Sequence, residues 1–523
     1  MRKFSTQITF DRRRIGDLNQ RKLSFLSNRP AEMSVQNKLL KIGILVMLIS
    51  YLYTLYTRNK TKSVYTIEQT VLNGWNKMIE APPTQFRKIV IGFNGNVDMI
   101  VSGTALLLRS NSKLEQAKEH SPIFTTDQLA ETFAHFFSCG AAAERYTSDT
   151  KVFTDAVKVA EDIPGASWAV GGNAAIMAQR ISASYSKSQV FLVGPVGPRL
   201  EALLHPNIRT ENRSKIAKDE IHLILEYKQG EIIGDYVAPT SSRFITSHDT
   251  LSSSQIIVEQ FFNAIEKHRP ELVIMSGLHL FHHQPEEIWM DRIKTIKRAL
   301  HQMNPNVPIH LQLGSFTNRV FAQHLVNRIL GYVSSIGLSE QELVFLAHAA
   351  DGPHQELYPL SGRVTLPVHK AVDILHWLIT TYGKDRASGP TLKRASYKLD
   401  RIHFFTLTYH ILVTRGPDWS NNAAALAAGA RVAGSTECGG ISATTVDANA
   451  NELRIAERFV LDTTTGTHYE LSPHSPMANW VRGDVFFMFS PALVCKQPEK
   501  TVGVGDIIAT TGLMYSSYYK FER

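Results

Sequence analysis

The chain has 523 residues, of which 43% are hydrophobic and 20% are charged. This composition supplies a sizeable core for two or three domains, or for one large α/β domain with a lid, and it excludes a chain that is mostly disordered. The whole chain has a net charge of +9, and residues 1–62 alone carry +10. The remaining residues are therefore near neutral and lack the basic surface of nucleic-acid-binding proteins, so we expect no nucleic-acid partner.

The N-terminal segment contains a long apolar run. Residues 42–57, IGILVMLISYLYTLYT, contain no charged side chain, and about 17–25 residues are needed to span a bilayer. Basic residues are concentrated before this run, so the positive-inside rule keeps the N-terminus in the cytoplasm. We predict a basic tail over 1–38 and a signal-anchor transmembrane helix over 39–57, with the remainder in the lumen of the endoplasmic reticulum. A cleaved signal peptide and a start at Met33 are the alternatives.

Two N-glycosylation triplets, at Asn59 and Asn212, fit a location in the secretory pathway. The three cysteines exclude both a disulfide framework and the spacing of zinc fingers, and an oxidising lumen permits one bridge. We expect the bridge to join Cys438 and Cys495, which both lie in the C-terminal part of the predicted sheet domain. Unpaired cysteines, as expected for Cys139, are also ordinary core residues.

Short β-branched runs alternate with longer helical patterns from residue 88 onward. This alternation predicts a parallel sheet covered by helices, with ligands bound at the carboxyl ends of the strands. Residues 222–247 differ, because their near-alternation of apolar and polar residues predicts antiparallel strands, which we assign to a lid. The runs are KIVIGFNG (88–95), QVFLVGPVG (189–197), ELVIMSGLHL (271–280), VPIHLQLGS (307–315), VSSIGLS (333–339) and HILVTRG (410–416).

Two segments of the predicted sheet domain carry amides and carboxylates at strand ends. Asn96 and Asp98 come just past the first strand, in GFNGNVDMI, while Gly172 and Asn173 open a predicted helix, in AVGGNAAIMAQRIS. Sugar hydroxyls both donate and accept hydrogen bonds, so these side chains suit a small polyol. Turn formation and helix entry are the alternative roles.

The segment TVGVGDIIATTG, residues 501–512, places one carboxylate at the start of a predicted helix. Gly503 and Gly505 allow backbone N–H groups to approach an anion without interference from a Cβ atom. Asp506 is therefore a candidate for chemistry on an anionic group. Its alternative role is to cap the helix, which Asp does often.

Residues 88–523 resemble the eukaryotic ADP-dependent glucokinases, which have the ribokinase-like fold. The resemblance implies a three-layer α/β/α domain over 88–523 with a smaller α+β lid, formed within 98–165 and 215–250. A linker and helical lead-in over 58–87 would precede it. The motifs that carry the resemblance are GFNGNVDMI, GAAAER, WAVGGNAAIMAQ, HLILEY, SRFITSHD, SGLHL, RIHFFTLTYHILVT, AAGARVAG and VCKQPEKTVGVGDIIATTGLMYS.

The resemblance also implies an activity and its residues. It implies transfer of a phosphoryl group from ADP to the 6-hydroxyl of glucose, giving glucose 6-phosphate and AMP, with Mg²⁺ as cofactor. Asp506 would be the general base, the backbone at Gly503 and Gly505 would stabilise the transferring phosphoryl group, and Arg243 would reach the nucleotide phosphates. Glu342 and Asp506 would belong to the metal site. The implied glucose ligands are Asn96, Asp98, Glu144, Gly172, Asn173 and His222, with Glu226 as the alternative to His222 on the same strand face.

The chain departs from the family pattern at three positions. Gln312 stands where the family has Glu, Ser339 where it has Asn, and Phe405 where it has a second His. The first two remove charge or a ligand from the metal site and the third changes the nucleotide pocket. They leave open two alternatives, a catalytically weak, membrane-tethered sugar- or nucleotide-binding protein and an ATP-dependent sugar kinase. We expect glucose, ADP and the membrane as partners, and a monomer.

Overall fold

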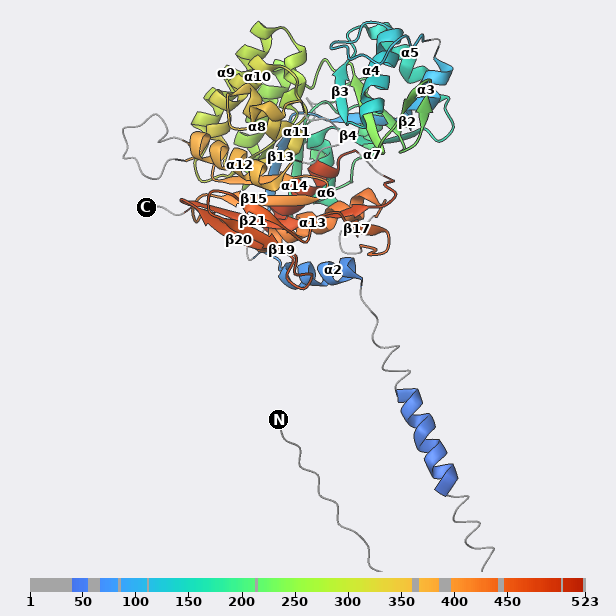
Figure 1. Cartoon of the computed structure of the whole chain (residues 1–523). Helices are drawn as coiled ribbons and strands as arrows, with labels where there is room; N and C mark the ends of the chain where they lie inside the picture. Colours follow the sequence, from blue (N-terminus) through green and yellow to red (C-terminus); the bar gives the residue numbers. More distant parts are fainter. Residues whose placement is uncertain are drawn as a thin grey trace, which may run out of the picture. The chain divides into compact units, whose positions relative to one another are not determined.

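The computed structural model describes residues 40–54, 66–82, 86–110, 112–211, 215–359, 366–384, 397–440, 446–499 and 502–520. The chain divides into two compact units, Met1–Val64 and Tyr65–Arg523. In the first unit residues 40–54 are helical (Figure 1). Across these ranges no helix combines the length and the apolar character that crossing a bilayer requires. The predicted basic tail and both glycosylation triplets, at Asn59 and Asn212, lie outside the described residues.

A ten-stranded sheet forms the centre of the second unit. Seven neighbouring strands run parallel, from β6 through β14, and the last three, β15, β21 and β20, are antiparallel. In spatial order the strands are β6 (Ile208–Thr210), β5 (Gln189–Val193), β1 (Lys88–Gly92), β11 (Leu272–Met275), β12 (Ile309–Gln312), β13 (Ser335–Ser339), β14 (Arg401–Phe405), β15 (Tyr409–Thr414), β21 (Val485–Pro491) and β20 (Ala478–Arg482).

The prediction of a parallel strand over 410–416 is wrong, because β15 pairs antiparallel with β14. Only three residues separate the two strands, whereas a parallel connection needs about a dozen. Thr406 fixes this turn, since its Oγ1 accepts hydrogen bonds from the backbone N–H groups of Thr408 and Tyr409, each at 3.1 Å. The hairpin carries Phe405 to the carboxyl end of the sheet.

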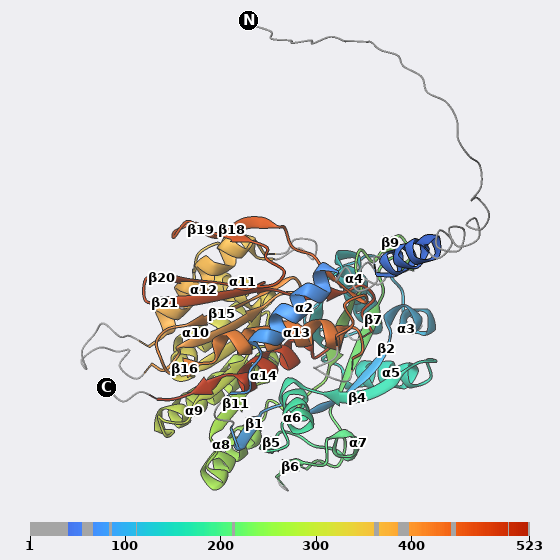
Figure 2. The same ribbon diagram turned by 90° about the horizontal axis from the view of Figure 1, so that it is seen from below.

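Helices cover both faces of the sheet (Figures 1 and 2). Strand β1 shows the arrangement: Val90 packs with the first group of helices, and its neighbours Ile89 and Ile91 pack with the second. Burial on both faces explains the continuous apolar strands, and the mixed α/β fold expected from the sequence is confirmed. The first group is α8 (Gln255–His268), α9 (Glu286–Gln302), α10 (Arg319–Arg328), α11 (Glu340–Ala349) and α12 (Val368–Tyr382), and the second is α6 (Asn173–Ser184), α13 (Asn422–Glu437) and α14 (Val504–Tyr515).

A second, five-stranded sheet forms a lid beside the carboxyl end of the large sheet. Apolar residues on one face, such as Met99, Leu223 and Phe244, pack with helices α3 (Gly103–Arg109), α4 (Thr126–Cys139) and α5 (Thr150–Glu161). The antiparallel strands predicted over 222–247 are confirmed by the pairing of β7 with β10. In spatial order the strands are β3 (Ala143–Tyr146), β10 (Ser242–Ser247), β7 (Ile221–Tyr227), β2 (Asn96–Ser102) and β4 (Ser167–Gly171).

Smaller elements complete the unit. Helix α2 (Ile67–Met78) lies along α13 (Figure 2), where Trp75 is buried and donates a hydrogen bond to the Ser490 hydroxyl at 3.0 Å. The others are the short helix α7 (Pro198–Leu203) and the 3₁₀ helices η2 (Leu278–His283), η3 (Leu330–Tyr332) and η4 (Gln355–Leu357). Four two-stranded pairs also occur: β8 (Ile232–Ile233) with β9 (Tyr236–Val237), β16 (Trp419–Ser420) with β23 (Ser517–Tyr518), β17 (Asn451–Leu453) with β22 (Leu493–Cys495), and β18 (Arg458–Asp462) with β19 (Thr467–Glu470).

The predicted disulfide is confirmed. Cys438, at the end of α13, is bonded to Cys495 in β22, with their Cα atoms 5.5 Å apart. Cys139 is free and exposed at the end of α4. The bridge ties the helix layer to a strand that precedes the Asp506 segment in the chain.

Candidate active site

The glycine-flanked segment forms the first turn of α14. Gly503 is the N-cap residue, in the left-handed conformation with φ of 74°, and Asp506 is the third helical residue. The Asp506 side chain is only 6% exposed, and no side chain caps this helix. The capping alternative is therefore wrong, and the carboxylate is available for another role.

Asn173 holds the Asp506 carboxylate. The Asn173 amide donates hydrogen bonds to both carboxylate oxygens, at 2.9 and 3.1 Å. Burial raises the pKa of Asp506 to about 7, Glu342 acts in the same direction, and the Asn173 bonds and Arg243 oppose them. A carboxyl group with a pKa near neutrality is well matched to a proton-accepting role.

The two glycines of the turn are required by their neighbours. A Cβ atom at Gly503 would lie 2.9 Å from the Ile176 side chain, and one at Gly505 would lie 2.8 Å from the ring of Phe405. Phe405, where the sequence departs from the family pattern, thus packs directly against the turn. The backbone N–H groups of this first turn are orphan donors, which suit an anionic group.

Asn96 and Asp98 begin lid strand β2, opposite the glycine pair that opens α6. The Asn96 amide donates to Asp98 Oδ1 at 2.8 Å, and β2 pairs with β4 so that Asn96 faces Gly171. A Cβ atom at Gly171 would lie 1.9 Å from Asp98 Oδ1, and Gly172 has a φ of 80°. Both glycines are therefore needed to bring Asn173 next to the two lid side chains.

Glu144 of β3 and His222 of β7 lie on the same face of the lid sheet, with β10 between their strands. His222 Nε2 is 2.6 Å from Asp249 Oδ2, and His222 Nδ1 is 3.7 Å from Glu144 Oε1. Burial disfavours the charged imidazole, but Asp249 and Glu144 outweigh it and raise the pKa of His222 to about 10. His279 lies on the other side of Glu144, with Nε2 3.6 Å from Oε2, and burial lowers the pKa of His279 to about 3. A cationic and a neutral histidine thus flank one carboxyl group.

Several polar atoms of this cluster are buried without a hydrogen-bond partner among the described residues. Such atoms cost about 1–3 kcal/mol each when they stay unpaired, so a site that carries several of them is built for a polar ligand. A sugar supplies hydroxyls that both donate and accept hydrogen bonds, and these suit unpaired atoms of this kind. The atoms are Asn96 Oδ1, Glu144 Oε1, Asp249 Oδ1 and His279 Nδ1.

Arg243 lies on β10, directly opposite Glu226 of β7, on the lid face that carries His222. Its Nε atom is buried without a partner among the described residues. Burial lowers the pKa of Arg243, and the carboxylates of Glu226, Asp506 and Asp98 oppose this shift. Because the charge of Asp506 acts on the Arg243 guanidinium, Arg243 is placed to bind an anionic group next to Asp506. Glu226 is thus placed beside Arg243, while His222 is the member of the strand that joins the Glu144 cluster.

Gln312, one of the departures at the predicted metal site, ends β12, and the predicted metal ligand Glu342 lies in the first turn of α11, directly after β13. Glu342 accepts hydrogen bonds from the backbone N–H of Ser339, at 2.7 Å, and from its hydroxyl, forming a capping box at the start of α11. Burial raises the pKa of Glu342. Gln312 Oε1 is buried and unpartnered among the described residues, and a Cβ atom at Gly337 would lie 2.2 Å from it. Within the described ranges no group of three or more His, Cys, Asp or Glu forms a metal cluster.

Three residues of this region were not predicted from the sequence. Asn94 donates a hydrogen bond to Asn173, Asp249 pairs with His222, and His279 faces Glu144. All three stand inside quoted motifs, and His279 also lies inside the apolar run 271–280. Their positions were available signals, but residue type alone does not separate a ligand from the side chain that supports it.

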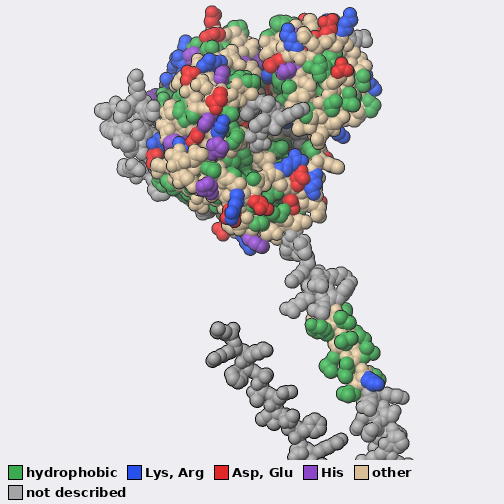
Figure 3. All heavy atoms as spheres, in the orientation of Figure 1, with side chains coloured by type: hydrophobic (Ala, Val, Ile, Leu, Met, Phe, Trp, Pro, Cys, Tyr) green, Lys and Arg blue, Asp and Glu red, His purple; other side chains and the backbone are tan. Residues whose placement is uncertain are grey.

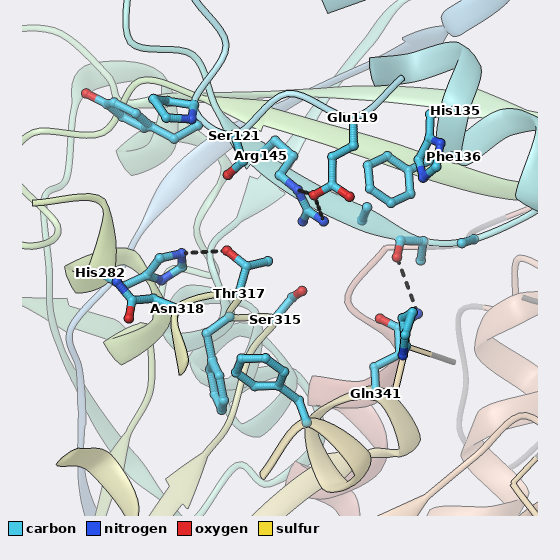
Figure 4. A pocket seen from close by; sticks show the side chains of 18 of the residues that line it. Glu119, Ser121, His135, Phe136, Arg145, His282, Ser315, Thr317, Asn318 and Gln341 are labelled. Atoms are coloured by element: carbon cyan, nitrogen blue, oxygen red, sulfur yellow. Dashed lines mark hydrogen bonds and ion pairs between the residues drawn. The ribbon is translucent and has the colours of Figure 1, made fainter. Parts of the chain in front are cut away.

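A cavity of about 1190 Å³ opens between the lid edge and the large domain (Figure 4). Glu342 lines it. The side chain of Gln341 donates a hydrogen bond to the backbone carbonyl of Ala142 at 3.3 Å. Figure 4 also shows Arg145 paired with Glu119 on the lid side of the cavity. Asp506, Asn173, Glu144 and His222 are not among the residues that line this cavity. On the face in Figure 3, acidic and basic side chains are interspersed.

The two sheets, the lid face and the buried carboxylate at a glycine-flanked helix start together define an α/β small-molecule kinase. Residues 87–515 match the model of the ADP-specific phosphofructokinase/glucokinase conserved region. The chain belongs to this family, and the resemblance inferred from the motifs is confirmed.

Relatives and solved structures agree with this assignment. The chain is 47% identical to a probable ADP-dependent glucokinase of Caenorhabditis elegans over 494 residues, which cover 94% of this chain and 98% of the relative. It is 39% identical to the ADP-dependent glucokinase of Bos taurus, over 85% of this chain and 87% of that protein. A solved ADP-dependent kinase in complex with fructose-6-phosphate and ADPbetaS shares the fold, with a TM-score of 0.60 at 18% identity over 86% of this chain and 97% of that one.

Proposed function

We propose that this protein transfers the β-phosphoryl group of ADP to the 6-hydroxyl of glucose, producing glucose 6-phosphate and AMP. The observation that carries the proposal is the buried Asp506 carboxylate, which Asn173 holds by two hydrogen bonds next to the unpaired polar atoms of the lid cluster. The names of the relatives support glucose as acceptor and ADP as donor. They do not favour a binding protein without catalysis or an ATP-dependent kinase.

In the proposed reaction the lid and the large domain each hold one substrate. Asn96, Asp98, Glu144 and His222, with Gly172 and Asn173 at the start of α6, bind the sugar hydroxyls. Asp506 accepts the proton of the 6-hydroxyl as the oxygen attacks phosphorus. The backbone N–H groups at Gly503 and Gly505 and the guanidinium of Arg243 stabilise the charge of the transferring group. Positioning and electrostatic stabilisation supply most of the catalysis in phosphoryl transfer.

Magnesium fits the residues beside Asp506. The side-chain oxygen of Gln312 is buried without a hydrogen-bond partner among the described residues, and Glu342 and Asp506 are buried carboxyl groups. Oxygen donors of this kind are the ligands that Mg²⁺ prefers. We propose that Glu342 and Asp506 hold Mg²⁺, through waters that the cation retains, and that Gln312 orients those waters. When bound, the cation neutralises charge on the phosphates.

Gln312→Glu is expected to lower the Mg²⁺ concentration that gives half-maximal rate, because a carboxylate attracts the hydrated cation more strongly than an amide does. The measurement is a Mg²⁺ titration of the initial rate. Gln302→Glu, which makes the same change at an exposed position near the end of α9, is the matched control and leaves the titration unchanged. An identical titration for Gln312→Glu would show that Gln312 does not act on the metal.

The activity is tested with purified protein, glucose, ADP and Mg²⁺ in an assay linked to oxidation of glucose 6-phosphate. We expect steady product formation that requires all three components. Binding of glucose without product formation would instead support the catalytically weak binding protein. All proposed site residues belong to one chain, so we propose that a monomer is active.

We propose that residues 39–57 anchor the protein in the endoplasmic reticulum membrane, with Tyr65–Arg523 in the lumen. The support is the charge-free run 42–57, the basic residues before it, and the disulfide, which an oxidising compartment favours. In intact microsomes we expect residues 65–523 to resist added protease and to become sensitive after detergent treatment. Digestion without detergent would place this part of the chain in the cytosol.

A further inference from the structure

A row of hydrogen bonds connects the backbone of α6 to the catalytic carboxylate. The backbone N–H of Ala174 donates to Asn94 Oδ1 at 3.1 Å, and Asn94 Nδ2 donates to Asn173 Oδ1 at 3.3 Å. Asn173 Nδ2 then donates to both oxygens of Asp506. Asn94 follows β1 and is only 1% exposed, so water does not compete for the hydrogen bond that it accepts from Ala174.

The two ends of this row determine how both amides are oriented. A backbone N–H can only donate, so the oxygen of Asn94 must face Ala174 and its NH₂ group must face Asn173. A carboxylate accepts, so the NH₂ group of Asn173 must face Asp506 and its oxygen must face Asn94. One arrangement satisfies every bond. Reversing either amide would set two oxygens or two NH₂ groups against each other.

The loop after β11 keeps Asn94 in place. Gly277 has a φ of 87°, and a Cβ atom there would lie 2.7 Å from Asn94 Cγ. The backbone of this loop is therefore packed against the Asn94 side chain, which leaves the amide little room to swing away from Asn173. The row is a rigid support rather than a set of interchangeable contacts.

We infer that Asn94 is a positioning residue for the phosphoryl transfer, because it orients the Asn173 amide so that its NH₂ group, and not its oxygen, faces Asp506. The inference rests on the proposed role of Asp506 as general base. Asn94 acts through Asn173. Its effect on the reaction is therefore transmitted entirely by the direction in which the Asn173 amide points.

Asn94→Asp tests this inference with little change in shape. The new carboxylate can still accept from Ala174, but it has no donor for Asn173, and the Asn173 amide is then driven to turn its oxygen toward Asp506. We expect kcat to fall about 10–10²-fold, the scale of a misplaced catalytic group, while the KM for ADP stays within about twofold. Asn304→Asp makes the same change in an exposed turn, where Asn304 Oδ1 also accepts from a backbone N–H, and is expected to leave kcat unchanged.

A double-mutant cycle separates positioning from a general structural effect. In an Asn173→Ala background, Asn94→Asp is expected to change kcat less than about twofold, because the side chain it acts through is gone. The inference would be overturned if the two substitutions together lowered kcat by the product of their separate effects. It would also be overturned if Asn94→Asp kept the wild-type kcat. Asn94→Ala, which buries no charge, serves if Asn94→Asp does not fold, and a fall in kcat is again expected. If the proposed function were wrong, the wild-type protein itself would form no product, which distinguishes that outcome from a failure of the inference about Asn94.

Discussion

Asp506→Asn is expected to lower kcat about 10²–10⁴-fold, the usual scale for loss of a general base. The amide cannot accept the proton of the 6-hydroxyl, but it keeps the shape of the side chain and can still accept a hydrogen bond from Asn173. Glucose affinity is therefore expected to stay within about threefold of wild type. Steady-state kinetics and calorimetric titration of glucose measure the two quantities separately.

The matched control is Asp149→Asn, at the N-cap of α5 on the lid. Asp149 accepts hydrogen bonds from the N–H groups of Lys151 and Val152 at 2.8 and 2.9 Å, a role that Asn also fills. This variant makes the same change in charge and is expected to keep wild-type turnover. If Asp506→Asn retained a turnover within threefold of wild type, Asp506 would not be the base.

Loss of the Cys438–Cys495 disulfide is expected to destabilise the folded protein by about 4 kcal/mol, the chain entropy released by opening a loop of this length. The two cysteines are 57 positions apart. In the double variant Cys438→Ser/Cys495→Ser, the midpoint of denaturant unfolding is expected to fall. A reductant is expected to lower the midpoint of the wild-type protein but not that of the double variant.

Cys139→Ser is the control, because Cys139 is free and exposed. Its unfolding midpoint is expected to match that of the wild-type protein with and without reductant. If the double variant unfolded at the wild-type midpoint, the bridge would add nothing to the free energy of unfolding.

Much of the fold could be predicted from local pattern. The β-branched runs gave the parallel strands, because strands buried on both faces are apolar throughout. The pattern could not give the direction of β15, since an apolar run reads the same in either direction. Direction depended on the three-residue turn after Phe405, in which Thr406 bonds the backbone.

The candidate site was predictable where a motif combined glycine with a carboxylate or amide. Asp98 and Gly171 illustrate this, because the missing Cβ atom of one makes room for the oxygen of the other. The supporting side chains were not predictable. Asp249 reaches His222 through the pairing of β10 with β7, in which Ser247 stands opposite His222. His279 reaches Glu144 through the packing of the lid against the segment after β11, and sequence spacing predicts neither contact.

The chemistry itself is tested most directly by following phosphorus in one reaction. Glucose, ADP and ATP at equal concentrations, with Mg²⁺ and the full-length protein, are monitored by ³¹P NMR. The proposed function predicts that AMP and glucose 6-phosphate appear in equal amounts while ATP stays constant. Consumption of ATP with a matching rise in ADP, and no AMP, would contradict it.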